Sequence, residues 1–306
     1  MGWNEDSLHR WLSRRPRPRA SLDFGNDAAV LARGLDRPVT CVDTVVEGVH
    51  FEKGERAALA GAKACARALS DLAATGAEPR AVLLGLRASR REEERRLRGL
   101  IAALDDCARA HGAELVGGDT TCAEGPLSLT VTAIGELPRS LVAPSRRRAR
   151  PGQVVVATGA FGGSLLGRHL RIEPRFEAAR WLLGLGATAM MDVSDGLALD
   201  LWRIARASGV AIDIGVVPVH PDARRLAERT GRSALAHALH DGEDHELVAT
   251  IPRASVQRAL RAAPRRCPGF TLLGQVRRGD GLWIPRDEAR EERVRFRGEG
   301  GWIHGS

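Results

Sequence analysis

Two spacings of apolar residues recur along the chain and predict strands and helices in alternation. Short apolar runs between turn residues predict strands, and apolar residues three and four positions apart predict helices that bury one face. The expected strands are 28–32, 39–42, 81–86, 114–116, 127–134, 154–157, 211–217, 245–251 and 270–276. The expected helices are 5–13, 57–74, 89–108, 222–229 and 255–263, with two further helices opened by the glycines at 159–163 and by Gly196. The pattern predicts an α/β protein.

A change of composition divides the chain. The stretch 138–151 is rich in proline and arginine, which is typical of a connection between domains. With 306 residues, the chain is long enough for two packed cores. We therefore expect an N-terminal domain at 1–139, a linker at 140–151 and a C-terminal domain at 152–306.

The net charge is strongly positive, but its distribution does not favour nucleic-acid binding. The formal charge is +8 and the pI is about 10.3. Lysine occurs only at Lys53 and Lys63, and the arginines are spread along the chain with acidic residues between them. A protein that binds DNA or RNA would gather its basic residues into a patch or stripe. We expect no nucleic-acid partner.

Cysteine usage and hydropathy favour a cytoplasmic protein. The five cysteines are scattered and form no Cys-x-x-Cys pair, so neither a disulfide framework nor a zinc site is expected. No apolar stretch approaches the roughly 18 residues of a membrane span. The first residues also lack the apolar segment of a secretory signal. We expect a cytoplasmic location and no membrane attachment.

Six aspartates stand in apolar or glycine-rich sequence, where an unpaired carboxylate is costly to bury. Two carboxylates about 4 Å apart repel by roughly 4 kcal/mol at an effective dielectric constant near 20, so several can converge only around cations. Oxygen ligands suit Mg²⁺, which usually shares its remaining positions with water and substrate phosphates. The pattern favours a phosphate-handling enzyme. The six are Asp27, Asp43, Asp71, Asp119, Asp192 and Asp195.

Simpler interpretations of these residues stay open. An aspartate that follows a strand is often a helix cap or a turn former, and Asp195 before Gly196 fits that role. The glycines at 159, 162 and 163 are only a weak phosphate-loop signal, and the chain has no Walker motif with its lysine. Phosphate charge would then have to be neutralised by Mg²⁺ and by arginines.

Six motifs, taken together, resemble thiamine-monophosphate kinases over essentially the whole chain. One motif alone would be weak evidence, but all six follow the order found in that family. They are 25–29 (Gly-x-Asp-Ala-Ala), 43–51 (Asp-Thr-x5-His-Phe), 69–77 (Leu-Ser-Asp-Leu-Ala-Ala-x-Gly-Ala), 117–121 (Gly-Gly-Asp-Thr-Thr), 192–197 (Asp-x-Ser-Asp-Gly-Leu) and 242–247 (Gly-Glu-Asp-x-Glu-Leu).

The resemblance implies the two-domain α/β fold shared with aminoimidazole ribonucleotide synthetase. Its N-terminal half forms a sheet or barrel with a second subunit, so a homodimer is implied. The implied reaction is ATP with thiamine monophosphate to give ADP and thiamine diphosphate, by direct in-line transfer of the γ-phosphoryl group. Such a transfer needs positioning and charge stabilisation, and it needs no protein nucleophile.

The resemblance also implies a role for each matching residue. The six aspartates would hold several Mg²⁺ ions, with Asp43 and Asp119 as the catalytic residues. The ATP-binding residues would be Gly118, Asp119, Arg146 and Ser194. The residues that recognise thiamine phosphate would be His50, Glu243 and Trp302. A carboxylate can bond the aminopyrimidine, and an indole can stack on a cationic ring.

The alternatives at the substrate positions are simple. His50 could be an ordinary surface histidine and Trp302 an apolar plug. Arg146 has arginine neighbours that could take its place. Three histidines close in sequence resemble a metal-binding cluster: His237, His240 and His245. Because they lie on both sides of a turn, their side chains are expected to point in different directions.

Three departures from the family pattern leave other functions open. Asn26 stands where the family usually has an aspartate, and Cys41 and Val42 stand where it has serine or threonine. One alternative is another enzyme of the same superfamily, which the motif at 43–51 and the absence of a cysteine before Cys41 disfavour. The other alternative is a nucleotide-binding or basic interaction protein that has the fold with weakened catalysis.

Overall fold

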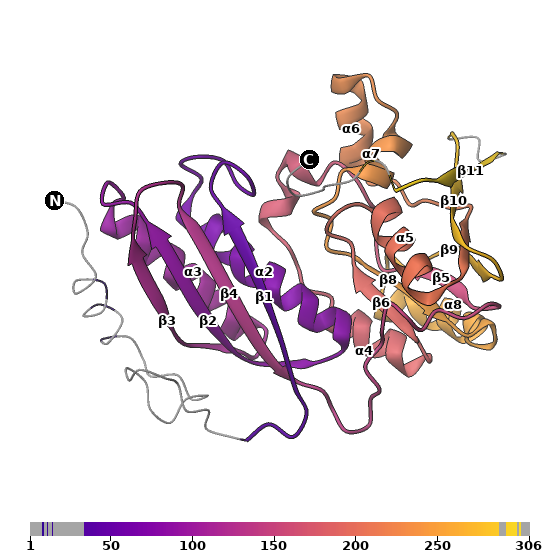
Figure 1. The fold of residues 1–306 in the computed structure, drawn as a ribbon, viewed down its shortest axis with the longest axis horizontal. Coiled ribbons are helices and arrows are strands. Elements are labelled where there is room, and N and C mark those ends of the chain that lie inside the picture. The colour runs from indigo at the N-terminus through magenta and orange to yellow at the C-terminus, as the bar shows by residue number, and fades with distance from the viewer. Residues whose placement is uncertain are drawn as a thin grey trace. The chain divides into compact units, whose positions relative to one another are not determined.

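The structure is a computed structural model that describes residues 8, 11, 14, 34–287, 292–298 and 300. The chain forms two compact units (Figure 1). The stretch 140–151, expected as a linker, is grouped with the second unit. The strand expected at 28–32 and most of the helix expected at 5–13 lie outside the described residues. The first unit comprises Met1–Leu72, Ala77–Arg139 and Leu170–Ile172, and the second comprises Ala73–Gly76, Ser140–His169 and Glu173–Ser306.

In its described residues, the first unit is a sheet with two helices, α2 and α3 (Figure 1). The sheet has the order β1-β4-β2-β3, in which β4 pairs antiparallel with β1 and β2, and β2 pairs parallel with β3. The elements are β1 (Pro38–Val46), α2 (Ala57–Thr75), β2 (Glu78–Ala88), α3 (Glu94–Ala110), β3 (Glu114–Cys122) and β4 (Ser128–Glu136).

Burial alternates along these strands, so the sheet has a covered face and an open face. In β4, Leu129, Val131 and Ala133 are buried and the residues between them are partly exposed. On the open face, the hydroxyls of Thr44 and Thr130 lie 2.9 Å apart across β1 and β4. Val42 on the same strand is 63% exposed. Every second residue of the sheet therefore faces solvent within this unit.

The second unit is built on a seven-stranded sheet of mixed direction, with the order β11-β10-β7-β9-β5-β8-β6. Its strands are β5 (Val154–Ala157), β6 (Ala189–Asp192), β7 (Ala211–Ile214), β8 (Leu247–Ile251), β9 (Thr271–Arg277), β10 (Gly281–Pro285) and β11 (Arg293–Phe296). Its helices are α4 (Phe176–Gly184), α5 (Leu197–Ser208), α6 (Pro221–Thr230), α7 (Ala234–His240) and α8 (Val256–Arg266), with short 3-10 turns η1 (Ser164–Leu166), η2 (Arg168–Leu170) and η3 (Arg253–Ser255).

Two apolar clusters hold the helices against this sheet. The first includes Leu201 and Ile204 of α5, packed with Ile212 and Ile214 of β7. The second includes Leu182 of α4 and Ala259 of α8, packed with Ala249 and Ile251 of β8 and with Val156 of β5. Because the apolar residues of α5 recur at helical spacing, the helix predicted after Gly196 is confirmed.

Two predicted helix starts are wrong. The glycines at 159–163 open only the 3-10 turn η1, because the following chain turns at Gly167 after three residues. The capping box predicted at Ser89 does not form: the Glu92 amide donates to the Ser89 backbone oxygen at 3.1 Å, which makes a turn. Helix α3 begins later, at Glu94, and buries the predicted apolar stripe. Among the described residues, no helix is long and apolar enough to cross a membrane.

Candidate active site

The predicted catalytic residue Asp43 in β1 is paired with an arginine of α2. Its Oδ2 lies 2.9 Å from Nε of Arg67. The side chains of Arg67 and Asp43 are 10% and 22% exposed, so the pair is largely shielded from water. Asp43 Oδ1 also accepts the amide hydrogen of Thr44 at 2.9 Å. Sequence reasoning missed Arg67, because one arginine in an alanine-rich helix gives no signal of its own.

A buried lysine of α2 lies against the predicted substrate residue His50. Lys63 is 0% exposed, and its Nζ donates to the backbone oxygen of His50 at 2.6 Å. The ring Nδ1 of His50 accepts the amide hydrogen of Val46 at 3.0 Å, which leaves the proton of the neutral ring on Nε2. These contacts fix both the backbone and the ring of His50, which is half-buried.

Gly118 and Asp119 lie in the edge strand β3, where two strands approach closely. Asp119 is exposed, and its Oδ2 accepts a hydrogen bond from the hydroxyl of Thr121 at 3.2 Å. Gly118 is in register with Leu84 of β2, and a Cβ at position 118 would overlap the Leu84 carbonyl group. Strand packing alone therefore requires glycine at 118. Asp71 is half-buried on α2, one helical turn beyond Arg67.

In the second unit, the two predicted motifs at 192–197 and 242–247 lie side by side. Backbone hydrogen bonds join Val193 to Glu246 (2.8 Å), Glu243 to Ser194 (2.7 Å) and His245 to Val193 (2.8 Å). These bonds continue the pairing of β6 with β8 beyond the regular strands. Glu243 and His245 have φ values of 55° and 52°, in the left-handed region. Such residues cost on the order of 1–3 kcal/mol each and persist only where the surroundings hold them.

Asp200, which sequence reasoning missed, fixes the turn at Ser194 and Asp195. Its Oδ2 accepts the amide hydrogens of Ser194 at 3.1 Å and Asp195 at 3.0 Å, and its Oδ1 accepts from Arg203 at 2.7 Å. Arg203 also pairs with Asp195. Asp200 is 0% exposed, and burial raises its pKa to about 7. In the sequence, Asp200 looks like any acid in the first turn of a helix, so no motif identifies it as a site residue.

His245 lies between two predicted site acids. Its Nδ1 is 3.2 Å from Oδ2 of Asp192, and its Nε2 is 3.9 Å from Oε2 of Glu243, which is an ion-pair distance but too long for a hydrogen bond. Burial lowers the pKa of His245, but the interactions with Asp192 and Glu243 outweigh it and raise the pKa to about 9. His245 therefore links the two motifs through its contacts with Asp192 and Glu243.

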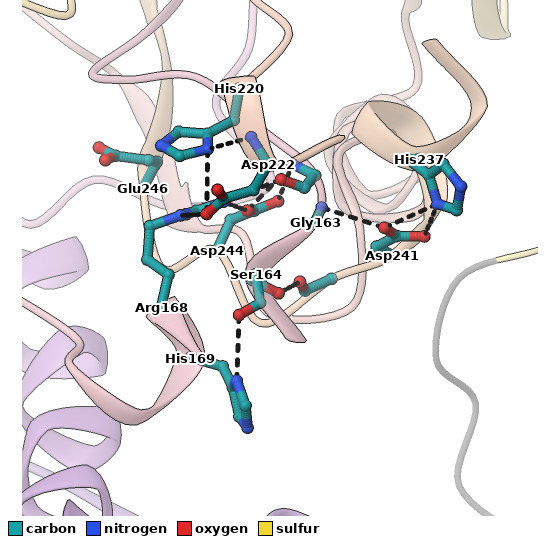
Figure 2. Close-up of polar contacts among 12 residues, drawn as sticks. Gly163, Ser164, Arg168, His169, His220, Asp222, His237, Asp241, Asp244 and Glu246 are labelled. Carbon is teal, nitrogen blue, oxygen red and sulfur yellow. Dashed lines mark hydrogen bonds and ion pairs between the residues drawn. The ribbon is translucent and has the colours of Figure 1, made fainter. Parts of the chain in front are cut away.

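In the glycine-rich loop at 159–164, the amides of Gly162 and Gly163 are already bound to carboxylates. Figure 2 shows its residues held by carboxylates from the segment that follows α7. The Gly162 amide donates to both carboxylate oxygens of Asp244 at 3.0 Å, and the Gly163 amide donates to Asp241 at 3.0 Å. The Ser164 hydroxyl donates to the Gly242 backbone oxygen at 2.7 Å. The weak phosphate-loop signal is thus explained by packing between two loops.

The three acids of the motif at 242–247 divide into two roles. Asp244 is fully buried against Gly162 and against Arg168, whose Nη2 lies 2.9 Å away. Burial raises the pKa of Asp244 to about 7. Glu246 accepts from the Thr158 hydroxyl at 2.6 Å and from Arg175 Nε at 3.0 Å. The side chain of Glu243 is the most exposed of the three, at 18% against 0% and 7%.

Three predicted residues remain, of which the structure describes one. Asp27 and Trp302 lie outside the described residues. Arg146 is exposed, and its backbone oxygen accepts from the Ser208 hydroxyl at 2.7 Å. Within the described ranges, no three histidine, cysteine or acidic side chains are grouped closely enough to hold a metal ion.

The histidines at 237, 240 and 245 point to different partners, as expected. His237 Nδ1 lies 2.9 Å from Asp241, whereas His245 contacts Asp192. The ring of His240 stacks on Phe296 with a centroid distance of 5.9 Å. The three therefore serve separate contacts.

Comparison of the sequence with known proteins finds similarity to thiamine-monophosphate kinases. Residues 25–137 match the family described as "AIR synthase related protein, N-terminal domain". The thiamine-monophosphate kinase of Rhodopirellula baltica is 35% identical over 316 residues, which cover 98% of this chain and 97% of the relative.

Solved structures agree with the sequence match. The crystal structure of the thiamine-monophosphate kinase from Stenotrophomonas maltophilia has a TM-score of 0.72 and 31% identity, and covers 92% of this chain and 96% of that one. The structure named "AaThiL complexed with AMPPCP and TMP" has a TM-score of 0.76 and 26% identity, over 98% of this chain and 95% of that one. The predicted fold is confirmed, and the chain belongs to the thiamine-monophosphate kinase family.

Proposed function

We propose that this protein transfers the γ-phosphoryl group of ATP to thiamine monophosphate, giving thiamine diphosphate and ADP. The observation that carries the proposal is family membership along the whole chain, at 35% identity over 98% of its length. A structural relative is described as complexed with AMPPCP, an ATP analogue, and with TMP. The described contacts at the predicted motifs agree with a site built from fixed carboxylates.

Catalysis would rest on positioning, because in-line phosphoryl transfer needs no covalent intermediate with the protein. Asp43 and Asp119 are the proposed catalytic residues. Ser194 is held in a turn by Asp200, and Glu243 is held by backbone bonds to the motif that contains Ser194. Residues fixed in this way can orient two phosphate-bearing substrates without reorganising during the reaction.

Mg²⁺ is the proposed cofactor, and the chemistry of the donor set fits it. Carboxylate oxygens are hard ligands of the kind Mg²⁺ prefers, and bound Mg²⁺ would neutralise phosphate charge. The thiol of Cys41 is a soft donor close in sequence to Asp43. It is not needed as a metal ligand, because its Sγ already donates to the Ala68 backbone oxygen at 3.1 Å. The proposed ligands are Asp27, Asp43, Asp71, Asp119, Asp192 and Asp195.

The proposed substrate contacts follow the family motifs. Two features of the structure support them: His50 is held in one orientation by Val46 and Lys63, and Glu243 is the most exposed acid of its motif. The residues proposed for ATP are Gly118, Asp119, Arg146 and Ser194. Those proposed for thiamine monophosphate are His50, Glu243 and Trp302.

We also propose a cytoplasmic homodimer in which the open face of the first unit's sheet meets a second copy. The support is that face itself, which exposes 63% of Val42 beside the Thr44–Thr130 pair. An apolar side chain on an otherwise flat strand surface is typical of a face that another protein covers. Light scattering on the wild type and on Val42→Glu tests this, since the charged variant should dissociate.

Product analysis tests the kinase function directly. Purified full-length protein is incubated with ATP, thiamine monophosphate and MgCl₂, and thiamine diphosphate and ADP are separated by chromatography. We expect thiamine diphosphate and ADP to form in equal amounts. EDTA or the substitution Asp119→Asn should abolish the formation of both products. ATP binding by calorimetry without either product would support the catalytically weakened homologue instead. Neither binding nor turnover would contradict both functions.

A further inference from the structure

One face of the second unit's sheet carries a groove that includes no residue of the six family motifs. Helix α5 packs on the face where Ile212 and Ile214 of β7 are buried. Asp213 lies between them in the strand, so its side chain points to the opposite face. Helices α4 and α8 cover that opposite face at β5 and β8. Beside α8, between η3, β9 and β7, a groove of about 790 Å³ stays open.

Three arginines and one aspartate set the charge of this groove. Arg277 Nη2 lies 2.8 Å from Oδ2 of Asp213, and Arg293 Nε lies 3.6 Å from its Oδ1. Asp213 therefore holds two guanidinium groups on either side of one carboxylate. Arg253 also lines the groove, and its side chain has no ion-pair partner in the described part of the chain. Three positive charges against one negative charge leave the lining at +2.

Most of the other side chains that line the groove are apolar, although Gln257 and Gln275 also contribute amides, and this mixture narrows the class of ligand. Val154, Val216, Val256 and Leu272 contribute to the wall, and Val216 is 39% exposed. Guanidinium groups match phosphate oxygens in pairs. An opening of this volume suits a small organic molecule, since ligand pockets usually measure roughly 300–1,000 Å³. A nucleic-acid strand would need a longer basic track than these three side chains provide.

We propose that this groove binds a small organic phosphate, whose phosphates contact Arg253 and Arg277 and whose apolar body lies against Val216 and Leu272. Asp213 is a positioning residue in this site, because it keeps Arg277 and Arg293 facing the opening. The proposal does not depend on the kinase function, since none of these residues belongs to the proposed catalytic or substrate-binding sets.

The test uses the full-length protein in EDTA, with inorganic tripolyphosphate and ATP as separate probes in calorimetry. Without divalent cations, the aspartate-rich motifs repel a polyphosphate, so saturable binding reports a cationic site. We expect both probes to bind and ATP to bind more tightly, because only ATP can use the apolar wall. Arg253→Gln and Arg277→Gln should each weaken both probes about tenfold, the usual effect of losing a charge-assisted hydrogen bond.

Arg261→Gln is the matched control, because Arg261 is an exposed arginine of α8 that does not line the groove. This variant should bind both probes like the wild type. Equal weakening by Arg261→Gln, no saturable binding of tripolyphosphate, or equal affinity for the two probes would overturn the proposal. If Arg277→Gln melts early because Asp213 has lost a partner, Arg253→Gln decides the outcome, since Arg253 is exposed and forms no ion pair with the described residues. Kinase turnover of Arg253→Gln should equal that of the wild type.

Discussion

Arg67 Nε lies 2.9 Å from Asp43 Oδ2, so a carboxylate proposed to hold Mg²⁺ already has a cation from its own chain. The metal and the guanidinium would compete for the same oxygen. The side chains of Arg67 and Asp43 are only 10% and 22% exposed, so removal of the arginine takes the paired cation away from a largely shielded carboxylate.

Arg67→Met keeps the aliphatic bulk of the side chain and removes its charge. We expect it to lower the free energy of unfolding by about 1–3 kcal/mol in EDTA, because a shielded carboxylate loses its partner. MgCl₂ should then raise the melting temperature of the variant more than that of the wild type. Thermal melts with and without MgCl₂ measure both effects. A stability loss that MgCl₂ does not reduce would argue against Asp43 as a ligand.

The contact between Asp200 and the Ser194–Asp195 turn predicts a combined loss of stability and activity. Asp200→Asn keeps one acceptor oxygen but cannot serve both the two amides and Arg203. We expect the free energy of unfolding to fall by roughly 2–4 kcal/mol, because a buried charged hydrogen bond is broken. The KM for ATP should rise, since Ser194 would no longer be fixed. Denaturant titration and steady-state kinetics measure the two effects.

Asp195→Asn is the comparison for that prediction. Asp195 pairs with the same Arg203, but its side chain is 22% exposed, whereas that of Asp200 is 0% exposed. Its substitution should therefore affect turnover with a much smaller loss of stability. Equal stability losses in the two variants would mean that Asp200 has no special role in holding the turn.

Asp244 predicts a dependence of stability on pH. Burial raises its pKa from 3.8 to about 7, so between these values the folded state binds a proton that the unfolded state has released. The stabilisation from the raised pKa of Asp244 is greatest below pH 3.8, the pKa of Asp244 in the unfolded state. It is lost as the pH rises through about 7, the pKa of Asp244 in the folded state. The largest slope that one proton can give is about 1.4 kcal/mol per pH unit.

Asp244→Asn removes the titrating proton while keeping nearly the same shape. Urea titrations between pH 4 and pH 8 should show that stability of the wild type falls more steeply with rising pH than that of the variant. Since Asp244 also contacts Arg168, the variant should be less stable than the wild type at pH 8, where the wild-type pair is charged. Parallel pH profiles would show that Asp244 has an ordinary pKa.

The sequence predicts the regular part of this molecule well, because helix and strand periodicity report local burial. The stripe that begins at Leu97 is buried in α3 as expected, and the helix after Gly196 starts at Leu197. Helix starts that depend on a cap are less predictable. The Ser89 segment closes a local turn, and only the tertiary packing of α3 shows where the helix begins.

Within the candidate site, sequence patterns identify the segments that matter. They do not predict which role each side chain of a segment has. The motif at 242–247 presents three acids, and two of them bind groups 82 and 88 residues away, at Gly162 and Thr158. Arg67 and Asp200 carry no motif of their own, so only the contacts with Asp43 and Ser194 reveal them. Such roles depend on pairing across the fold, which local spacing cannot encode.

Substitution of Gly118 should show how the close packing of β3 against β2 affects activity, separately from any contact that Gly118 makes with ATP. Gly118→Ala would place a Cβ against the Leu84 carbonyl, so β3 must shift away from β2 next to Asp119. We expect a loss of about 1–3 kcal/mol in unfolding free energy, as for other overpacked sites, and a larger fractional loss of kinase turnover than of stability. Circular dichroism melts and product assays measure the two.

Gly85→Ala is the matched control, because Gly85 of β2 is in register with Asp119 and a Cβ there would meet Thr130 at an ordinary 3.5 Å. The control should fold and turn over like the wild type, because glycine is not sterically required at that position. If both variants lose activity equally, the effect comes from any added methyl group near Asp119 and not from the close approach at Gly118. If Gly118→Ala retains full activity, Asp119 tolerates displacement, and its proposed catalytic role has to be withdrawn.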